Sequence, residues 1–455
     1  FCIDDKKDRL DLWNLEDGQH VLAFRPYEGE TSYNCRIRWA GFADENHLVT
    51  LSDHCKLVGW KLPECRAVYA SDPSLGWVAG MARDRRTLVV MCGRTPHLID
   101  ALSGELLGTL PEIESDGMLL LPRAGFSGDE NRLAVLSARE EGCLVAAWDM
   151  TDRSRLLNLE LPFRAYGMVW CGPDHILVNR STGADEPDVL IDVQQGLVVW
   201  NYAATRGTSL ASTPDGRCWF ECCPGITGPS ELAAFELPEA EVMSILSRVV
   251  SPEPLIGPNA AVTVQTQIED PPQVIPPGWA GLEKLDEGLY QHFAKQLQER
   301  HVAVVARGNV RLVVGIEQEK KEQTMSVGGL FGPSRRFLLS ATLLMPYVAV
   351  VDSSGNRIWS RLPKKNDMKP ANLEDCPEGV DKEAYMKLHQ WEQAVAWLRT
   401  VKIPYPLFHP SVHRGFGESV LTPGKTEIRR SPSPAQMKPE SKTAKLVNAG
   451  VGHPG

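Results

Sequence analysis

In the first half of the chain, short apolar runs alternate with polar turns in a recurring order. A bulky apolar residue followed by a polar one ends one run, and a turn and a second apolar run come next. These closing pairs are Trp13-Asn14, Trp60-Lys61, Ile99-Asp100, Trp148-Asp149, Ile191-Asp192 and Phe235-Glu236, at spacings of 47, 39, 49, 43 and 44 residues. The spacing indicates a repeat of about 40–45 residues.

A second marker follows the same period. It is a polar turn between two apolar runs, and its aspartates are Asp44, Asp84, Asp129, Asp174 and Asp215, which are 40, 45, 45 and 41 residues apart. The flanking runs, such as 47–51, 87–91 and 132–136, are rich in residues that favour β-strands. Each unit is therefore predicted to hold short antiparallel strands.

Five residues after each of the first five closing residues, three units carry a glycine. Gly18, Gly104 and Gly196 suit the positive φ that a hairpin turn often requires. Cys65 and Arg153 stand at this place in the other two units, so we expect a turn that is not uniform.

A four-stranded unit of this length has two apolar faces that it cannot cover alone. In a radial arrangement, neighbouring sheets bury each other's faces. Residues 1–237 are therefore predicted to form a β-propeller with five complete blades and a partial one. We interpret five tryptophans as packing residues between blades: Trp13, Trp60, Trp148, Trp200 and Trp219.

Two segments of these units resemble tryptophan–aspartate (WD) repeats. They are residues 48–62, which end near Trp60, and residues 133–150, which contain Trp148-Asp149. The turn 213–216 is similar to the Ser-Pro-Asp-Gly turn of bacterial members. No unit carries the Gly-His pair that opens a full repeat, and Asp53 and Glu141 stand at about the aspartate position of the family. The resemblance implies a propeller that binds a protein or peptide on its face.

The number of blades is open. Phe1 falls inside a strand hairpin, so we expect a missing N-terminus with further blades upstream. Alternatively, a late strand at 261–265 closes the ring.

The second half of the chain leaves the repeat pattern. Residues 238–277 are predicted to form an amphipathic helix and a proline-rich linker with one strand. Residues 278–421 are predicted to form a smaller α+β domain, with helices on an antiparallel sheet and Asp381 as the N-cap of the later helix. Residues 422–455 are predicted to be a disordered basic tail.

Composition is that of a soluble globular protein, with 43% hydrophobic and 23% charged residues. The chain has 48 Lys and Arg against 58 Asp and Glu, a net charge of −10, which argues against nucleic-acid binding through a broad basic surface. No apolar run reaches the roughly 18 residues that a membrane span needs. The 11 cysteines are interpreted as free thiols of a reducing, cytoplasmic environment.

Motifs that could carry chemistry are incomplete. The cysteines 218, 222 and 223 lack a second ligand pair, and Pro410 separates His409 from His413. Strands rather than a helix are expected on both sides of the glycine loop 328–332, which disfavours phosphate binding. The acidic neighbours 140 and 141 would point to opposite faces of a strand. We therefore predict no catalytic, cofactor-binding or metal-binding residue.

The sequence thus favours a non-catalytic scaffold that mediates protein–protein interaction. The alternative is a propeller enzyme, hydrolase or quinoprotein-like, with a site in the central channel. A sensory or structural module of a longer chain is a third hypothesis. Oligomeric state is not predicted.

Overall fold

The structure, a computed structural model, divides the chain into two compact units. Unit 1 consists of Phe1–Ser251 and Ser411–Gly455, and unit 2 consists of Pro252–Pro410. The structure describes residues 1–4, 6–29, 36–71, 76–115, 119–139, 142–180, 187–204, 210–212, 217–222, 231–269, 271, 284–327, 335–363, 381–422, 424–433 and 436–438. Along the chain, unit 2 is inserted between two segments of unit 1.

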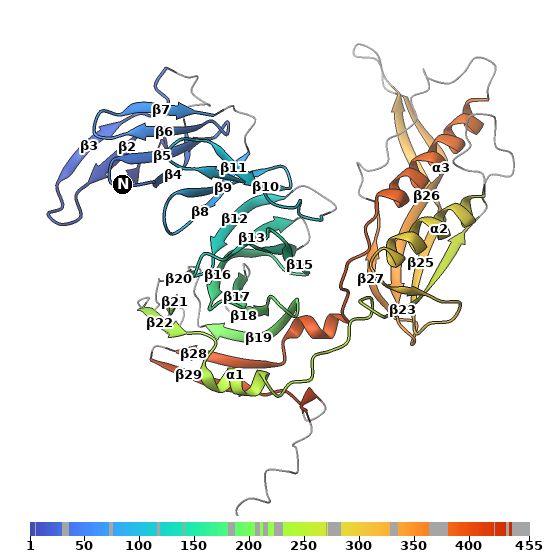
Figure 1. Cartoon of the computed structure of the whole chain (residues 1–455). Helices are drawn as coiled ribbons and strands as arrows, with labels where there is room; N and C mark the ends of the chain where they lie inside the picture. The colour runs from blue at the N-terminus through green and yellow to red at the C-terminus, as the bar shows by residue number, and fades with distance from the viewer. Residues whose placement is uncertain are drawn as a thin grey trace, which may run out of the picture. The chain divides into compact units, whose positions relative to one another are not determined.

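Unit 1 begins with four small antiparallel sheets that follow one another along the chain (Figure 1). The first contains β1 (Cys2–Ile3), β2 (Leu10–Trp13) and β3 (His20–Phe24). The second contains β4 (Ile37–Phe42), β5 (His47–Ser52), β6 (Leu57–Lys61) and β7 (Arg66–Ala70). The third contains β8 (Trp77–Met81), β9 (Thr87–Cys92), β10 (Thr95–Asp100) and β11 (Leu106–Thr109). The fourth contains β12 (Leu120–Phe126), β13 (Arg132–Arg139), β14 (Gly142–Asp149) and β15 (Arg155–Leu161).

Two further sheets complete the described part of unit 1. The fifth contains β16 (Ala165–Cys171), β17 (His175–Arg180), β18 (Asp188–Asp192), β19 (Leu197–Ala204), β28 (Gly417–Thr422) and β29 (Lys425–Arg430). The sixth contains β20 (Leu210–Ser212), β21 (Arg217–Cys222) and β22 (Glu231–Glu236), and helix α1 (Ala240–Leu246) follows it. Strand β28 pairs with β19 in parallel, and β29 pairs with β28 in antiparallel orientation.

Neighbouring sheets bury each other's faces. In β5, Leu48 packs into the core shared with the first sheet, whereas the next residue, Val49, packs into the core shared with the third sheet. In β13, Leu133 and Ala134 divide in the same way between the third and fifth sheets. All four side chains are fully buried. Because successive strand residues point to opposite faces, the middle strands are covered on both sides.

The first marker of the repeat has a constant structural place. Trp60 and Trp148 both lie on the third strand of their sheets, at a register shift against the fourth strand. Ile99 and Ile191 occupy the same position in the third and fifth sheets, and Trp13 lies at an equivalent shift between the last two strands of the three-stranded first sheet. The sequence repeat is therefore also a repeat of backbone structure.

The turn after this marker is more uniform than the sequence predicts. Five residues after each of the first five markers the backbone has a positive φ, at Gly18 (70°), Cys65 (51°), Gly104 (75°), Arg153 (63°) and Gly196 (68°). The expectation of a non-uniform turn is therefore wrong for the backbone, because Cys65 and Arg153 adopt the left-handed conformation that glycine adopts elsewhere.

The second marker closes the turns between the first and second strands. Asp44, Asp84 and Asp129 each accept a hydrogen bond from the backbone N–H two residues later, at 2.7, 2.8 and 3.2 Å. An aspartate in this position mimics a backbone turn. Asp215 and the turn 213–216 lie outside the described residues.

The tryptophans differ in their surroundings. Trp148 and Trp200 are fully buried, which agrees with a packing role, whereas Trp13 is 47% exposed. The indole N–H of Trp200 donates to Ser419 Oγ at 2.9 Å, whereas no described group accepts from Nε1 of Trp148 or Trp219. Trp60 donates to Thr50 Oγ1 at 2.9 Å.

The end of the chain contributes to unit 1. Strands β28 and β29 extend the fifth sheet, and α1 also belongs to unit 1. The structure therefore differs from the predicted boundaries, because residues 411–421 do not belong to the α+β domain and Lys425–Arg430 are ordered as a strand rather than a disordered tail. Residues 439–455 lie outside the description.

Unit 2 is a mixed sheet covered by helices. The sheet order is β24 (Ala303–Val304), β23 (Ala261–Ile268), β25 (Val310–Val327), β26 (Arg335–Val351) and β27 (Arg357–Arg361). Strands β25, β26 and β27 are antiparallel, as predicted. Strand β23 pairs in parallel with β24 and β25, so the sheet is mixed rather than antiparallel throughout. The residues proposed to close the ring, 261–265, form part of β23 in this separate unit.

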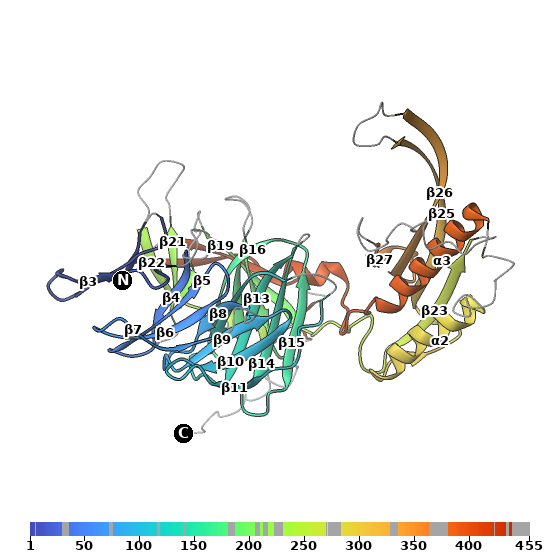
Figure 2. The same ribbon diagram turned by 90° about the horizontal axis from the view of Figure 1, so that it is seen from above.

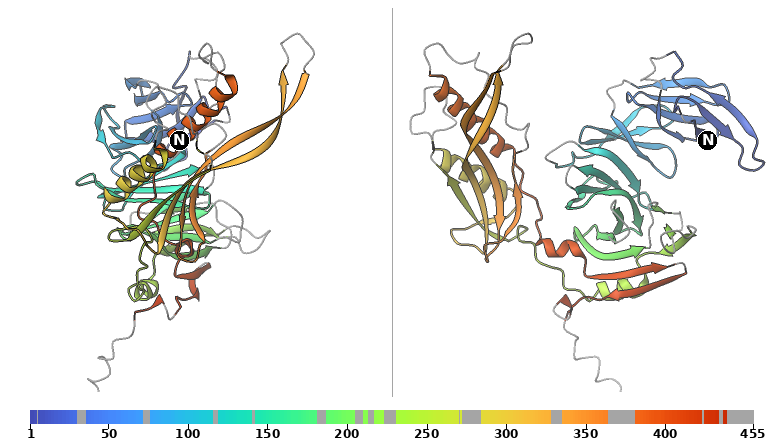
Figure 3. Two further views of the ribbon diagram at one scale, coloured as in Figure 1. Left: turned by 90° about the vertical axis from the view of Figure 1, so that its right-hand side faces the viewer. Right: turned by 180° about the vertical axis from the view of Figure 1, so that it is seen from behind.

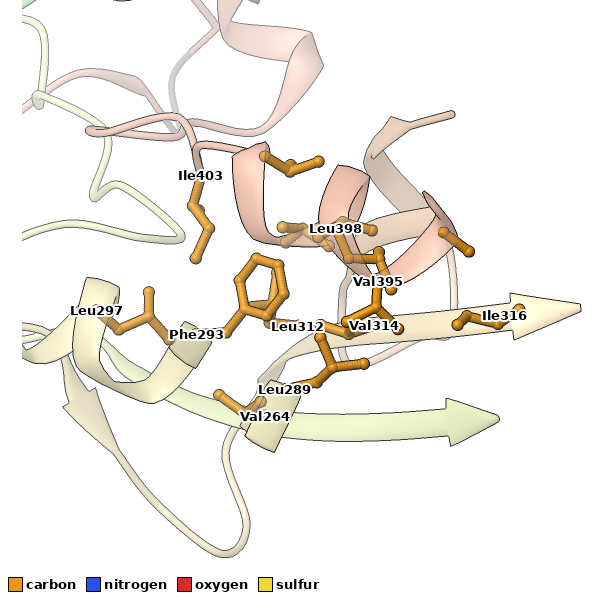
Figure 4. Packing of buried hydrophobic residues seen from close by; sticks show 14 of the residues in the cluster. Val264, Leu289, Phe293, Leu297, Leu312, Val314, Ile316, Val395, Leu398 and Ile403 are labelled. Atoms are coloured by element: carbon orange, nitrogen blue, oxygen red, sulfur yellow. The ribbon is translucent and has the colours of Figure 1, made fainter. Parts of the chain in front are cut away.

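Helices α2 (Leu285–Gln298) and α3 (Lys382–Thr400) pack on one face of this sheet (Figure 4). Phe293 and Leu398 meet Leu312 in a core that is almost completely buried. Asp381 caps α3, as predicted, by accepting a hydrogen bond from Ala384 N–H at 2.9 Å. The apolar helix stripes in the sequence therefore mark the buried faces.

Strands β25 and β26 continue beyond the helices as a long, curved ribbon (Figures 2 and 3). On the sheet face away from the helices, the ring of Tyr347 lies across Gly315, and a Cβ at Gly315 would collide with it. Tyr347 also donates to Gln267 Oε1 at 2.8 Å. The position of the Tyr347 ring therefore requires glycine at position 315.

The architecture is mainly β, in several small sheets, with α2 and α3 in the later part of the chain. None of the helices seen in the described ranges combines the length and apolar character needed to cross a bilayer.

Candidate functional site

A pocket of about 450 Å³ lies within unit 1, at one end of the fifth sheet. The turns β16–β17 and β18–β19 form one wall, and α1 with the segments after it and before β28 forms the other. Its lining residues are Asp174, His175, Asp192, Gln194, Gln195, Val199, Met243, Leu246, Ser247, Val249 and Phe416. A volume of this size is typical of ligand sites.

Sheet register places a histidine beside a carboxylate in the pocket. His175 begins β17 and Asp192 ends β18, and the two are paired across the antiparallel ladder. His175 is only 8% exposed, and none of the described groups forms a hydrogen bond with its ring. Because the ring lines the pocket and its nitrogens are not sealed off inside the protein, they can bond to a ligand there.

The charge state of His175 follows from its burial. Burial lowers the pKa of His175, and the carboxylates of Asp192 and Asp174 act in the opposite direction without cancelling the effect. The imidazole is therefore neutral at pH 7, so one of its ring nitrogens is a hydrogen-bond acceptor.

Both carboxylates are held in place by neighbouring groups. Asp174 accepts a hydrogen bond from Arg132 Nη1 at 2.6 Å, an ion pair that joins the fourth and fifth sheets. Asp192 accepts from Gln195 N at 2.8 Å and from Gln195 Nε2 at 2.9 Å. Because Gln195 Oε1 accepts from Ser251 Oγ at 3.0 Å, this turn is tied to the segment after α1.

The other wall is apolar. Met243 and Leu246 come from α1, and Phe416 comes from the returning chain. The backbone N–H of Phe416 donates to the carbonyl of Val199 at 2.9 Å, which fixes the returning segment against β19. Gly417 allows this approach, because a side chain there would collide with the Trp200 ring. The pocket therefore combines an acidic wall with an apolar one.

The opposite end of the same sheet holds a buried carboxyl group. Asp188 is 6% exposed and accepts hydrogen bonds from Asn179 Nδ2 at 3.1 Å and from Arg180 N at 3.2 Å. Burial raises its pKa to about 7, although the two hydrogen bonds and the Arg180 charge act to lower it. We assign it to the fold, because its carboxyl group is already hydrogen-bonded within the sheet.

The residues weighed from the sequence do not meet in the pocket. Cys218 is buried in β21, and His409 is exposed on a loop. Strands β25 and β26 flank the glycine loop 328–332, as expected, but the loop itself lies outside the described residues, as do Glu140, Glu141 and Cys223. The side chains of Cys222 and His413 are also outside the description. Among the described residues, no group of three or more His, Cys, Asp or Glu is arranged to hold a metal.

The pocket residues were partly visible in the sequence. Asp174 and Asp192 belong to the two repeat markers, and His175 follows Asp174 directly. The signal that could have linked them is the strand register, which pairs the end of one run with the start of the next. The apolar wall had no such signal, because Phe416 is far away in the sequence.

No protein-family model matches this chain, and no curated protein is significantly similar to it.

Proposed function

We propose that unit 1 is a β-propeller scaffold of the tryptophan–aspartate repeat kind and that it binds a protein or peptide partner without catalysis. The shared cores support the propeller, since the middle strands of the second, third and fourth sheets are covered by sheets on both sides. The constant place of the repeat markers, at a register shift before a positive-φ turn, also supports it.

The binding proposal depends on one observation, the half-acidic pocket that contains the unpartnered ring of His175. The pocket lies at strand ends, where propellers present the turns that usually make contacts. Its carboxylates and the acceptor nitrogen of His175 suit a cationic hydrogen-bond donor, and its apolar wall suits an aliphatic stem. A lysine or arginine side chain has both parts. The partner is therefore a protein segment that inserts a basic side chain.

Binding of labelled peptides to the full chain tests this function. The peptides share one neutral sequence and differ at a central position that holds arginine, lysine, citrulline or glutamate. Citrulline keeps the shape of arginine but lacks its charge. We expect arginine and lysine peptides to bind at least about tenfold more tightly than the citrulline peptide, a difference of about 1.4 kcal/mol, and salt to weaken them.

A matched pair of variants locates the binding. Met243 lines the pocket and is 41% exposed, whereas Met386 on α3 in unit 2 is 38% exposed. Met243→Arg places a cation in the pocket and should abolish binding of the arginine peptide, whereas Met386→Arg should leave it unchanged. Equal binding of arginine and citrulline peptides, or full binding by the Met243→Arg variant, would overturn the proposal.

A further inference from the structure

Two buried cysteines face each other across the boundary between the fifth and sixth sheets. Cys171 is the last residue of β16, and Cys218 is the second residue of β21. Their Sγ atoms are 3.2 Å apart, and both residues have no exposed surface. A disulfide has an S–S bond of about 2.05 Å, so only about 1.1 Å of closure separates the thiols from a bond.

The backbone holds this pair in position. Cys171 is paired with His175 in the fifth sheet, and Cys218 is paired with Ser212 and Phe235 in the sixth. Strand β16 also contacts β20 and β21. Each thiol is thus carried by a hydrogen-bonded strand, and the two strands hold the sulfurs 3.2 Å apart.

The other cysteines of the described structure lack this arrangement. Cys143 is equally buried, in β14, but no thiol of the described residues forms a hydrogen bond with it. Cys2 is exposed, and Cys65 is partly buried. Cys55 and Cys92 are partly buried and interact electrostatically, but no hydrogen bond joins their sulfurs in the described structure. The pair is therefore a specific feature rather than a general consequence of the cysteine content.

We propose that Cys171 and Cys218 are a disulfide-forming pair that small peroxides oxidise, and that the bond links the fifth and sixth sheets of unit 1. One thiolate attacks a peroxide oxygen, which gives a sulfenic acid and releases hydroxide. The second thiol then attacks the sulfenic sulfur, which forms the S–S bond and releases water. For hydrogen peroxide the balance is two thiols and one peroxide to one disulfide and two waters.

The surroundings set the rate of this reaction. The hydrogen bond with Cys218 and burial, together with the charge of Glu239, hold the pKa of the Cys171 thiol well above its ordinary value. Thiolate, the reactive form, is therefore scarce at neutral pH, and peroxide must reach a closed interior. We expect oxidation to be slow in the native state and faster under conditions that open the sixth sheet locally.

The bond would close a loop of 47 residues and restrain β21 against β16. The same buried region contains Tyr202, whose hydroxyl donates to Glu239 Oε2 at 2.8 Å just before α1 begins. Oxidation therefore fixes the sheet that leads into the helical wall of the pocket, whether or not the pocket binds a peptide.

Peptide mapping of the full chain tests the proposal. The reduced protein is treated with hydrogen peroxide, remaining thiols are alkylated in denaturant, and digested peptides are read by mass spectrometry with and without reduction. We expect the linkage between Cys171 and Cys218 to be the main product. Hydrogen exchange of the β21 amides should slow at least about tenfold on oxidation and recover on reduction.

Two variants serve as controls. Cys218→Ala should abolish the linkage and the change in exchange, whereas Cys143→Ala, an equally buried site, should retain both. If Cys218→Ala does not fold, the proposal is judged by peptide mapping of the wild-type chain, in which the linkage between Cys171 and Cys218 must be the main product. The proposal is overturned if peroxide yields mainly sulfinic acids or other cysteine pairs, or if β21 exchanges equally fast in both redox states.

Discussion

Replacing Asp188 by asparagine should stabilise unit 1 by an amount that grows with pH. Asp188 is buried, and its pKa lies at about 7 in the folded chain, against about 3.9 in an unfolded one. Between these values the native state retains a proton that the unfolded state has released. The stability of the wild type therefore falls as pH rises through this window, and above about pH 7 the native state carries a buried charge.

The magnitude follows from the two pKa values. Three pH units correspond to about 4 kcal/mol in total, of which about 3 kcal/mol is lost between about pH 5 and about pH 8. An asparagine amide does not titrate, and its oxygen can still accept from Asn179 and Arg180. The stability advantage of the Asp188→Asn variant should thus increase by about 3 kcal/mol across this range.

Urea unfolding followed by tryptophan fluorescence at several pH values measures this advantage. Asp152→Asn is the matched control, since Asp152 is exposed in a turn and its pKa is lowered by hydrogen bonds from Ser154. Asp152 stays ionised throughout the range, so its variant should show a constant difference. A difference for Asp188→Asn that changes by less than about 0.5 kcal/mol would refute the argument that burial controls this carboxyl group.

Three further predictions concern the packing and the turns, and urea unfolding of the variants tests each of them. Trp148→Phe should destabilise the protein by about 1–2 kcal/mol less than Trp200→Phe, because only the latter removes an indole hydrogen bond; equal losses would contradict this. Gly315→Ala should lower the free energy of unfolding by about 1–3 kcal/mol, because the new methyl group collides with the Tyr347 ring. Gly288→Ala, on the open surface of α2, should raise the free energy of unfolding by up to about 1 kcal/mol. The opposite order of stabilities would disprove the packing. Arg85→Gly should raise the free energy of unfolding by about 0.5–1 kcal/mol, because Arg85 has a φ of 60°, which strains any residue but glycine. A lower free energy of unfolding would count against backbone strain at this position.

The repeat was predictable because each unit carries its own local signals. Apolar runs, aspartate turns and the residue that precedes each left-handed turn all lie within about 45 residues of sequence. The identical backbone at Cys65 and Arg153 was not predictable, since the fold imposes there a φ that the side chains disfavour. Local patterns thus identified the strands, whereas the fold decided the turn conformation.

Features that depend on distant pairing could not be predicted. Strand β28 has the alternation of buried and more exposed residues of an ordinary strand, and its sequence does not indicate that it pairs with β19. Parallel pairing of β23 with β25 was missed for the same reason. For the pocket, Asp174 and Asp192 were visible as repeat markers, but their association with His175 depends on the register of the strands.

The parallel pairing of β19 with β28 also constrains the order of events during synthesis. The partners Trp200 and Ser419 are 219 residues apart, and the whole of unit 2 is translated between them. A nascent chain can complete its first four sheets and then unit 2 while the outer edge of β19 still lacks its neighbour. The pocket therefore acquires Phe416, and with it a finished wall, only after the whole of unit 2 has been translated.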